Sequence, residues 1–210
     1  MEILKNMKRL VVFLLLTSVL RVAAFSQEFL TISEAFKRSY SYETEGKYTE
    51  AAGELLKIYD ENNYDLNIRL GWLTYNGGSY AESMNYYLKA IALKPYAIEP
   101  RFGFVSPAAA VGNWNQVEEQ YKKILEVDPM NTKANYYLGL IYYNRQQYDI
   151  ALKYFEKVVN LYPFDYDSVI MYAWTNYMML NLREAKVLFQ KALLIKPNDA
   201  SAIEGLGLIQ

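Results

Sequence analysis

Four of the six prolines in this 210-residue sequence are evenly spaced, and that spacing limits the possible folds more than any other feature. They are Pro95, Pro129, Pro163 and Pro197, each 34 residues after the one before. Each stands at the end of an apolar run, where proline stops a helix because it lacks an N–H and its ring clashes with the preceding turn. A constant period of about 20–50 residues indicates a solenoid of stacked repeats.

The same residue types recur at fixed places in each 34-residue unit. The units counted from the prolines begin at residues 64, 98, 132, 166 and 200. In the unit 132–165, Leu138 and Gly139 hold the seventh and eighth places, Ala151 the twentieth and Phe155 the twenty-fourth. Apolar residues three and four apart predict one apolar stripe on each of two antiparallel helices. A single pair cannot bury its own stripe, so neighbouring pairs must stack.

This register resembles the tetratricopeptide repeat (TPR) family, most completely at Leu138, Gly139, Tyr142, Ala151, Phe155 and Pro163. The resemblance implies an all-α fold, an α-solenoid of antiparallel helix pairs with the right-handed superhelix of TPR proteins. The predicted repeats are about 32–63, 64–97, 98–131, 132–165 and 166–199, followed by a terminal helix at 200–210. We therefore expect residues 27–210 to form a single TPR-like array.

Two segments depart from the repeat pattern. In the unit from residue 98, Pro100 falls in the first turn, where proline is tolerated, but Pro107 falls mid-helix. We expect the helix to bend or break at Pro107, either as a local fault absorbed by packing or as a widening of the groove. The terminal helix either seals the last hairpin, which we favour, or leaves Leu208 and Ile209 as an apolar edge for self-association.

The first 26 residues have the layout of a secretory signal peptide. Basic residues (Lys5, Lys8 and Arg9) precede an apolar run at residues 10–20 and small residues that end at Ser26. We predict cleavage between Ser26 and Gln27, and a periplasmic or secreted protein. The alternative is an uncleaved membrane anchor, although the apolar run is shorter than the ~20 residues that span a bilayer.

The composition excludes several classes of chemistry. The sequence has no cysteine and no histidine, which removes disulfides, thiolate nucleophiles, Cys/His zinc sites and histidine acid–base catalysis. A formal net charge of −1 gives no electrostatic footprint for nucleic acid. No phosphate-binding loop or nucleophile motif occurs. We therefore expect no enzymatic activity, no metal and no cofactor.

In TPR proteins the first helix of each pair lines a concave face, and the resemblance implies which places point into it. The predicted partner-binding residues are Ile68, Trp72, Tyr75, Asn76, Phe102, Lys133, Tyr136, Leu140, Tyr143, Asn144, Ile170, Trp174 and Tyr177, with Ser106, Ala109, Ala110, Asp167 and Met178 on the same face. Trp and Tyr suit binding because they combine a large contact area with a polar tip. Alternatively, some of these rings pack between neighbouring helices. We favour surface display for Trp72 and Trp174 only.

Three hypotheses for function remain open at this stage. The first is a non-enzymatic scaffold of the cell envelope that binds an extended or helical segment of another protein on the concave face. The second is a glycan-binding module, because exposed Trp and Tyr also stack on sugar rings. The third is an architectural subunit that uses the convex face or the C-terminal edge.

Some TPR proteins bind the C-terminal carboxylate of a peptide with five Lys, Asn and Arg side chains. Only Lys133 matches that pattern here, so the sequence does not predict this kind of binding.

Overall fold

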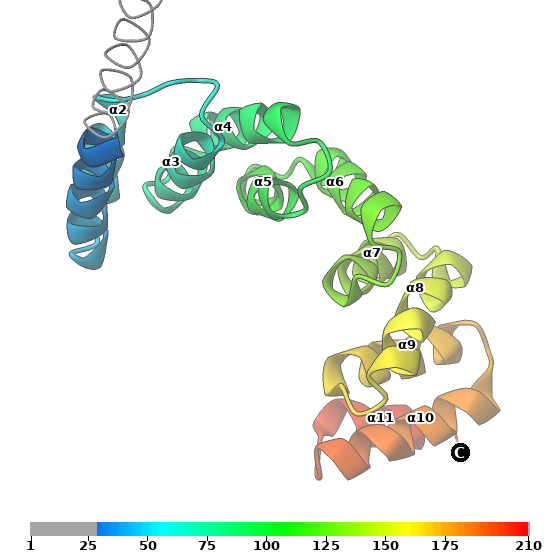
Figure 1. Cartoon of the computed structure of the whole chain (residues 1–210). Coiled ribbons are helices and arrows are strands. Elements are labelled where there is room, and N and C mark those ends of the chain that lie inside the picture. The colour runs from blue at the N-terminus through cyan, green and yellow to red at the C-terminus, as the bar shows by residue number, and fades with distance from the viewer. Residues whose placement is uncertain (1–28, 210) are drawn as a thin grey trace, which may run out of the picture. The chain divides into compact units, whose positions relative to one another are not determined.

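The structure, a computed structural model, describes residues 29–209. The predicted signal peptide lies outside these residues. The described chain is a succession of helices joined by short loops, without a strand (Figure 1). Within residues 48–93 and within residues 99–207, consecutive helices pack against each other, which confirms the predicted all-α class of paired helices.

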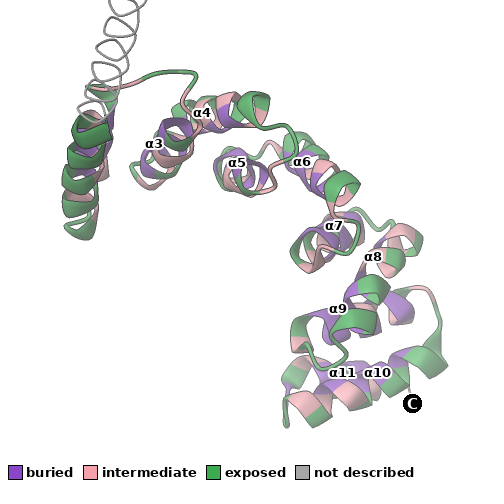
Figure 2. Cartoon of the chain, viewed as in Figure 1, coloured by how far each residue is buried: buried purple, intermediate pink, exposed green. Residues whose placement is uncertain are grey.

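The chain divides into two compact units, with the boundary between Leu93 and Lys94. Unit 1 contains a helix at residues 29–44 and the helices α2 (Tyr48–Leu56), α3 (Tyr64–Asn76) and α4 (Tyr80–Leu93). Unit 2 contains α5 (Glu99–Ala110), α6 (Trp114–Val127), α7 (Thr132–Asn144), α8 (Tyr148–Leu161), α9 (Tyr166–Met178), α10 (Leu182–Ile195) and α11 (Ala200–Gly207). Within each unit, buried residues lie on helix faces that meet a neighbouring helix (Figure 2).

The first helix of most pairs begins at a repeated side-chain cap. Asn63, Asn131, Asp165 and Asp199 each accept a hydrogen bond from the backbone N–H three residues later. Such a cap satisfies one of the N–H groups that a helix leaves unpaired at its start. Ala97 stands at this place before α5, and that helix begins at Glu99 with Ile98 as its N-cap residue and without a side-chain cap.

A second repeated contact holds each of three first helices to the loop before it. The fourth residue of the repeat donates to a backbone carbonyl six residues earlier: Asn67 to Glu61 (2.8 Å), Arg101 to Pro95 (2.8 Å) and Asn135 to Pro129 (3.1 Å). We call Asn67, Arg101 and Asn135 the loop-tie residues. All three are buried, so these hydrogen bonds satisfy polar groups that would otherwise be costly to bury.

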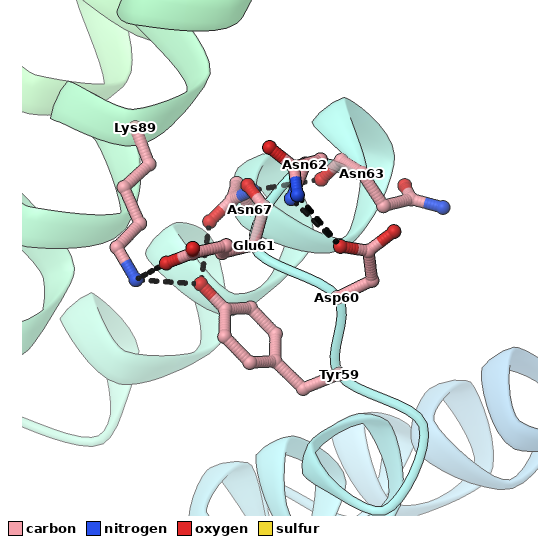
Figure 3. Close-up of polar contacts among 7 residues, drawn as sticks. All are labelled: Tyr59, Asp60, Glu61, Asn62, Asn63, Asn67 and Lys89. Atoms are coloured by element: carbon pink, nitrogen blue, oxygen red, sulfur yellow. Dashed lines mark hydrogen bonds and ion pairs between the residues drawn. The ribbon is translucent and has the colours of Figure 1, made fainter.

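In unit 1 the loop-tie residue is part of a larger polar network (Figure 3). The Tyr59 hydroxyl donates to Asn67 Oδ1 (3.0 Å) and accepts from Lys89 Nζ (2.9 Å). Lys89 Nζ also lies 3.6 Å from a Glu61 carboxylate oxygen. The loop between α2 and α3 is thereby joined to α4.

In unit 2 a carboxylate joins α6 to α7. Glu118 accepts hydrogen bonds from the Tyr142 hydroxyl (2.7 Å) and from Lys122 Nζ (2.6 Å), and it pairs with Arg145. Burial alone would raise the pKa of Glu118, but these three donors outweigh it and lower the pKa to about 2.

Glycine at the eighth repeat place allows the two helices of a pair to approach closely. A Cβ on Gly71 would lie 2.9 Å from Tyr87 Cζ, and one on Gly139 would lie 2.6 Å from Phe155 Cε1. Gly205 of α11, at the sixth place, lies in the same way against the Phe189 ring of α10, which leaves no room for a Cβ. The terminal helix therefore covers the hairpin α9–α10, as we expected.

Pro107 does not break its helix. The helix α5 runs without interruption from Glu99 to Ala110, with Pro107 inside and Pro100 in the first turn, so of the expected bend or break the break does not occur, and a bend stays a prediction. Pro107 lies in the last turn, where the only intrahelical bond lost is the one to the carbonyl of Gly103. Gly103 has the most adaptable backbone of any residue type, and Pro107 is itself buried, so the core holds this turn in place.

Candidate functional site

The predicted site residues of unit 1 lie on α3, and Trp72 is the most exposed of them. Its side chain is 44% exposed, whereas Ile68, Tyr75 and Asn76 are half-buried. The indole Nε1 of Trp72 donates to Glu43 Oε1 (2.7 Å). The Trp72 ring is thus exposed, while its N–H already has a partner, and its role in binding stays a prediction.

Trp72 belongs to a cluster that sequence analysis did not find. The Arg69 guanidinium lies 3.9 Å from the centre of the Tyr40 ring and pairs with Glu43. The hydrogen bond from Arg69 lowers the pKa of Glu43, burial opposes this, and the bond from Trp72 adds to the lowering. No local pattern signals the pair, because Arg69 and Glu43 lie 26 residues apart and outside the places that define the repeat.

On α9 the structure corrects one predicted site residue, Ile170, and half-buries another, Trp174. Ile170 is only 7% exposed and packs in the core of unit 2, so it is not available to a partner. Trp174 is half-buried: its ring meets Phe189 edge-on at 4.9 Å, and its Nε1 donates to Ser201 Oγ (2.8 Å). Trp174 is therefore less exposed than Trp72, because α10 and α11 pack around it. Tyr177 lies against Trp174, with ring centres 5.6 Å apart.

Two predicted residues of α7 line a cleft of about 360 Å³, which we call the α7–α9 cleft. Its lining comes from the start of α7, the end of α8 and the first turn of α9: Thr132, Lys133, Tyr136, Tyr137, Val158, Tyr162, Asp165, Asp167 and Ser168. Lys133, Tyr136 and Asp167 were all predicted on the concave face. Tyr137 and Tyr162 were not, because they stand outside the places that the resemblance assigns to it.

The wall of this cleft is a packed set of rings. Tyr136 lies edge-on to Tyr137 (5.5 Å) and to Phe155 (6.0 Å), and Tyr137 stacks on Tyr121 (5.5 Å). Burial raises the pKa of Tyr136, and the nearby carboxylates of Asp167 and Asp165 add to this rise. Its hydroxyl is therefore neutral and able to donate or accept a hydrogen bond at neutral pH.

The remaining predicted residues of unit 2 lie outside the lining of the α7–α9 cleft. Leu140, Tyr143 and Asn144 come later on α7, where Tyr143 lies edge-on to Tyr148 at 5.3 Å. The ring centres of Phe102 of α5 and Tyr121 lie 6.2 Å apart, and Lys133 Nζ lies 4.7 Å from the centre of the Phe102 ring. Leu140, Tyr143 and Phe102 are half-buried, whereas Asn144 and Lys133 are exposed, as are Ser106, Ala110 and Met178.

Comparisons with known proteins agree with this geometry. Two models of the tetratricopeptide repeat match the chain, at residues 36–98 and 132–165. A tetratricopeptide repeat protein from Parabacteroides merdae has a similar solved structure, with a TM-score of 0.73, 22% identity, and coverage of 86% of this chain and 72% of that chain. The helix pairs define an α-solenoid, and the chain belongs to the tetratricopeptide repeat family.

Two curated relatives are longer proteins. Human protein O-mannosyl-transferase TMTC1 is 28% identical over 145 residues, which are 67% of this chain and 16% of that protein. The TPR repeat-containing protein YpiA of Bacillus subtilis is 28% identical over 138 residues, 64% of this chain and 32% of that protein. The chain thus spans about a third or less of their length. TPR proteins generally bind other proteins and are generally non-catalytic scaffolds.

The described residues offer little to other kinds of site. Between residues 29 and 209, no helix is long and apolar enough to cross a membrane. In the same part of the chain, no three Asp or Glu side chains gather where they could hold a metal ion.

Proposed function

We propose that this chain is a non-enzymatic scaffold of the cell envelope, and that the α7–α9 cleft of unit 2 binds a segment of another protein. The observation that carries the proposal is the lining of this cleft, which has three tyrosines, two carboxylates, one lysine, a serine and a threonine hydroxyl, and one valine. Rigid aromatic rings beside a few polar groups give both contact area and orientation to a bound segment. The membership of the TPR family supports a protein as the partner.

A crosslinked pull-down from the envelope of the native host tests this proposal. The bait chains are the wild type, Tyr136→Ala in the cleft, and Tyr96→Ala, whose ring is 83% exposed and lies outside the lining of the cleft. We expect one protein to be recovered with the wild type and Tyr96→Ala and lost with Tyr136→Ala. Circular dichroism checks that both variants fold. Recovery that is equal with all three chains would contradict binding in the cleft.

Glycan binding is the second candidate, since tyrosine faces beside carboxylates also suit a sugar. The same three chains distinguish it: retention on immobilised envelope polysaccharide, lost with Tyr136→Ala, would favour a glycan over a protein. An architectural role through the convex face or the C-terminal edge would leave both assays unchanged by Tyr136→Ala.

Export is a separate part of the proposal, and it rests on the basic and apolar layout of residues 1–26. We expect the chain purified from the host to begin at Gln27. Mass spectrometry of the intact protein measures this directly, and a mass that includes residues 1–26 would rule out cleavage.

A further inference from the structure

We propose that the α7–α9 cleft recognises an arginine side chain of the partner segment. This inference rests on the proposed function, and it adds the chemistry that selects the partner. Three features of the cleft support it: an excess of negative charge, exposed tyrosine faces, and a buried hydroxyl without a partner.

Negative charge exceeds positive charge in the lining. Asp165 and Asp167 both contribute carboxylates, and across residues 29–209 neither forms an ion pair. Asp165 Oδ2 accepts the cap bond from the Ser168 N–H at 3.0 Å, which leaves its other oxygen available. Lys133 is the only basic residue of the lining, and its Nζ lies over the Phe102 ring of α5. The described residues therefore leave a local negative charge that is not neutralised, and a cationic ligand would neutralise it.

The tyrosines favour a guanidinium over an ammonium group. A guanidinium is planar and weakly hydrated, so it stacks on an aromatic face while its fork of donors binds a carboxylate. Unit 1 contains an internal example of this chemistry, in which the Arg69 guanidinium lies over Tyr40 and pairs with Glu43. The α7–α9 cleft offers the same two components, tyrosine rings and carboxylates, without the arginine.

Ser168 provides an independent observation at the same place. This residue lines the cleft in the first turn of α9, is 1% exposed, and its Oγ has no hydrogen-bond partner among the described residues. A buried hydroxyl without a partner is uncommon and unfavourable. Arginine has five N–H donors, enough to serve the two carboxylates and still reach a hydroxyl.

A titration followed by NMR tests the inference on the whole chain. The probe is Nα-acetyl-arginine amide, and Nα-acetyl-citrulline amide is its neutral isostere. We expect the arginine probe to shift the backbone amides of Asp167 and Ser168, and the citrulline probe to leave them unchanged. Addition of salt should weaken the effect, because the contact is between charges near the surface.

Two matched variants locate the binding. Asp167→Asn should weaken the arginine probe at least about fivefold, as expected for loss of a charge-assisted hydrogen bond. Asp65→Asn is the control, because Asp65 holds the same repeat place in the first turn of α3, in unit 1. It should leave the affinity unchanged.

Equal shifts with citrulline, or equal affinity in Asp167→Asn, would overturn the recognition of arginine. The same holds if maltose shifts these amides and the arginine probe does not. The pull-down separates this failure from failure of the proposed function. A partner lost with Tyr136→Ala but retained with Asp167→Asn would refute recognition of arginine and leave binding in the cleft supported. A partner retained with both variants would refute binding in the cleft itself.

Discussion

Leu180 occupies a backbone conformation that suits glycine. It follows α9 with φ +61°, and glycines stand at the equivalent place after the first helix of three earlier pairs, at Gly46, Gly78 and Gly112, with φ of 73°, 82° and 74°. Gln146 holds this place after α7, at φ 60°. A side chain in this left-handed region is strained because its Cβ crowds the following carbonyl. Leu180 is also 80% exposed, so little packing offsets the strain.

We therefore predict that Leu180→Gly stabilises the protein. Relief of the strain raises the free energy of unfolding, whereas the greater freedom of glycine in the unfolded chain lowers it. The net gain should be about 0.5–1 kcal/mol. Urea denaturation measures the change. Leu194→Gly is the control, since Leu194 is 77% exposed but lies in the last turn of α10 with helical backbone, and it should lose up to about 1 kcal/mol. A loss in both variants would contradict the assigned strain.

Single residues also mark the limit of sequence analysis in the candidate site. Trp72 and Trp174 stand at the same repeat place, yet the ring of Trp72 is displayed whereas Trp174 packs on Phe189 and bonds Ser201. The difference arises because each ring contacts a different neighbour from another helix. The place of a residue within its repeat does not specify that neighbour. The cleft tyrosines Tyr137 and Tyr162 were missed because they stand outside the repeat places that the family resemblance assigns to the concave face.

At the scale of an element, the close approach of α7 and α8 depends on a residue without a side chain. Phe155 is fully buried and fills the space above Gly139, where a Cβ would lie 2.6 Å from the ring. We predict that Gly139→Ala lowers the free energy of unfolding by about 1–3 kcal/mol, because a packed core cannot yield to the extra atom without strain. Chemical denaturation measures the loss.

Gly53→Ala is the matched control for that change. Gly53 also lies inside a helix, α2, but nothing stands within 4 Å of a Cβ built on it. Alanine should therefore stabilise this helix by up to about 1 kcal/mol through its better propensity. If Gly139→Ala also stabilised the protein, the contact with Phe155 would not set the spacing of the pair.

The helices themselves were largely predictable, because their signals are local. Periodic prolines, small residues and apolar stripes each act within one hairpin, so the sequence is sufficient to identify the pairs. Pro107 is the exception: its effect depends on Gly103 and on how firmly the core holds the last turn of α5. Such a balance between local strain and burial cannot be read from one residue type.

At the scale of the whole molecule, Glu118 makes stability depend on pH. Its carboxyl has an unperturbed pKa of 4.5 and a pKa of about 2 when folded. A group whose pKa falls on folding stabilises the folded state above its unfolded pKa and loses this contribution as pH falls through the folded pKa. Its side chain is 12% exposed, and since one pKa unit corresponds to about 1.4 kcal/mol, the contribution at neutral pH is about 3 kcal/mol.

We predict that Glu118→Gln lowers the free energy of unfolding at pH 7 by about 2–3 kcal/mol. Below pH 4.5 the difference from the wild type should shrink, to less than about half at pH 3. Urea unfolding at several pH values measures both effects. Glu119→Gln, at the neighbouring exposed position, should change little at any pH. A difference between wild type and Glu118→Gln that does not vary with pH would contradict the ionic origin.

The loop-tie residues have a consequence for how such a chain can change in length. Asn135 reaches back only to carbonyls of the segment Pro129–Asn131, and Asn131 caps the helix that Asn135 belongs to. Each such hairpin therefore carries its own means of attachment to whatever loop precedes it. A duplication or deletion of one complete 34-residue period would transfer the attachment intact, whereas a change of a few residues in the loop would pull the donor away from its carbonyl. Gain and loss of whole hairpins is the least disruptive route by which this chain could diverge.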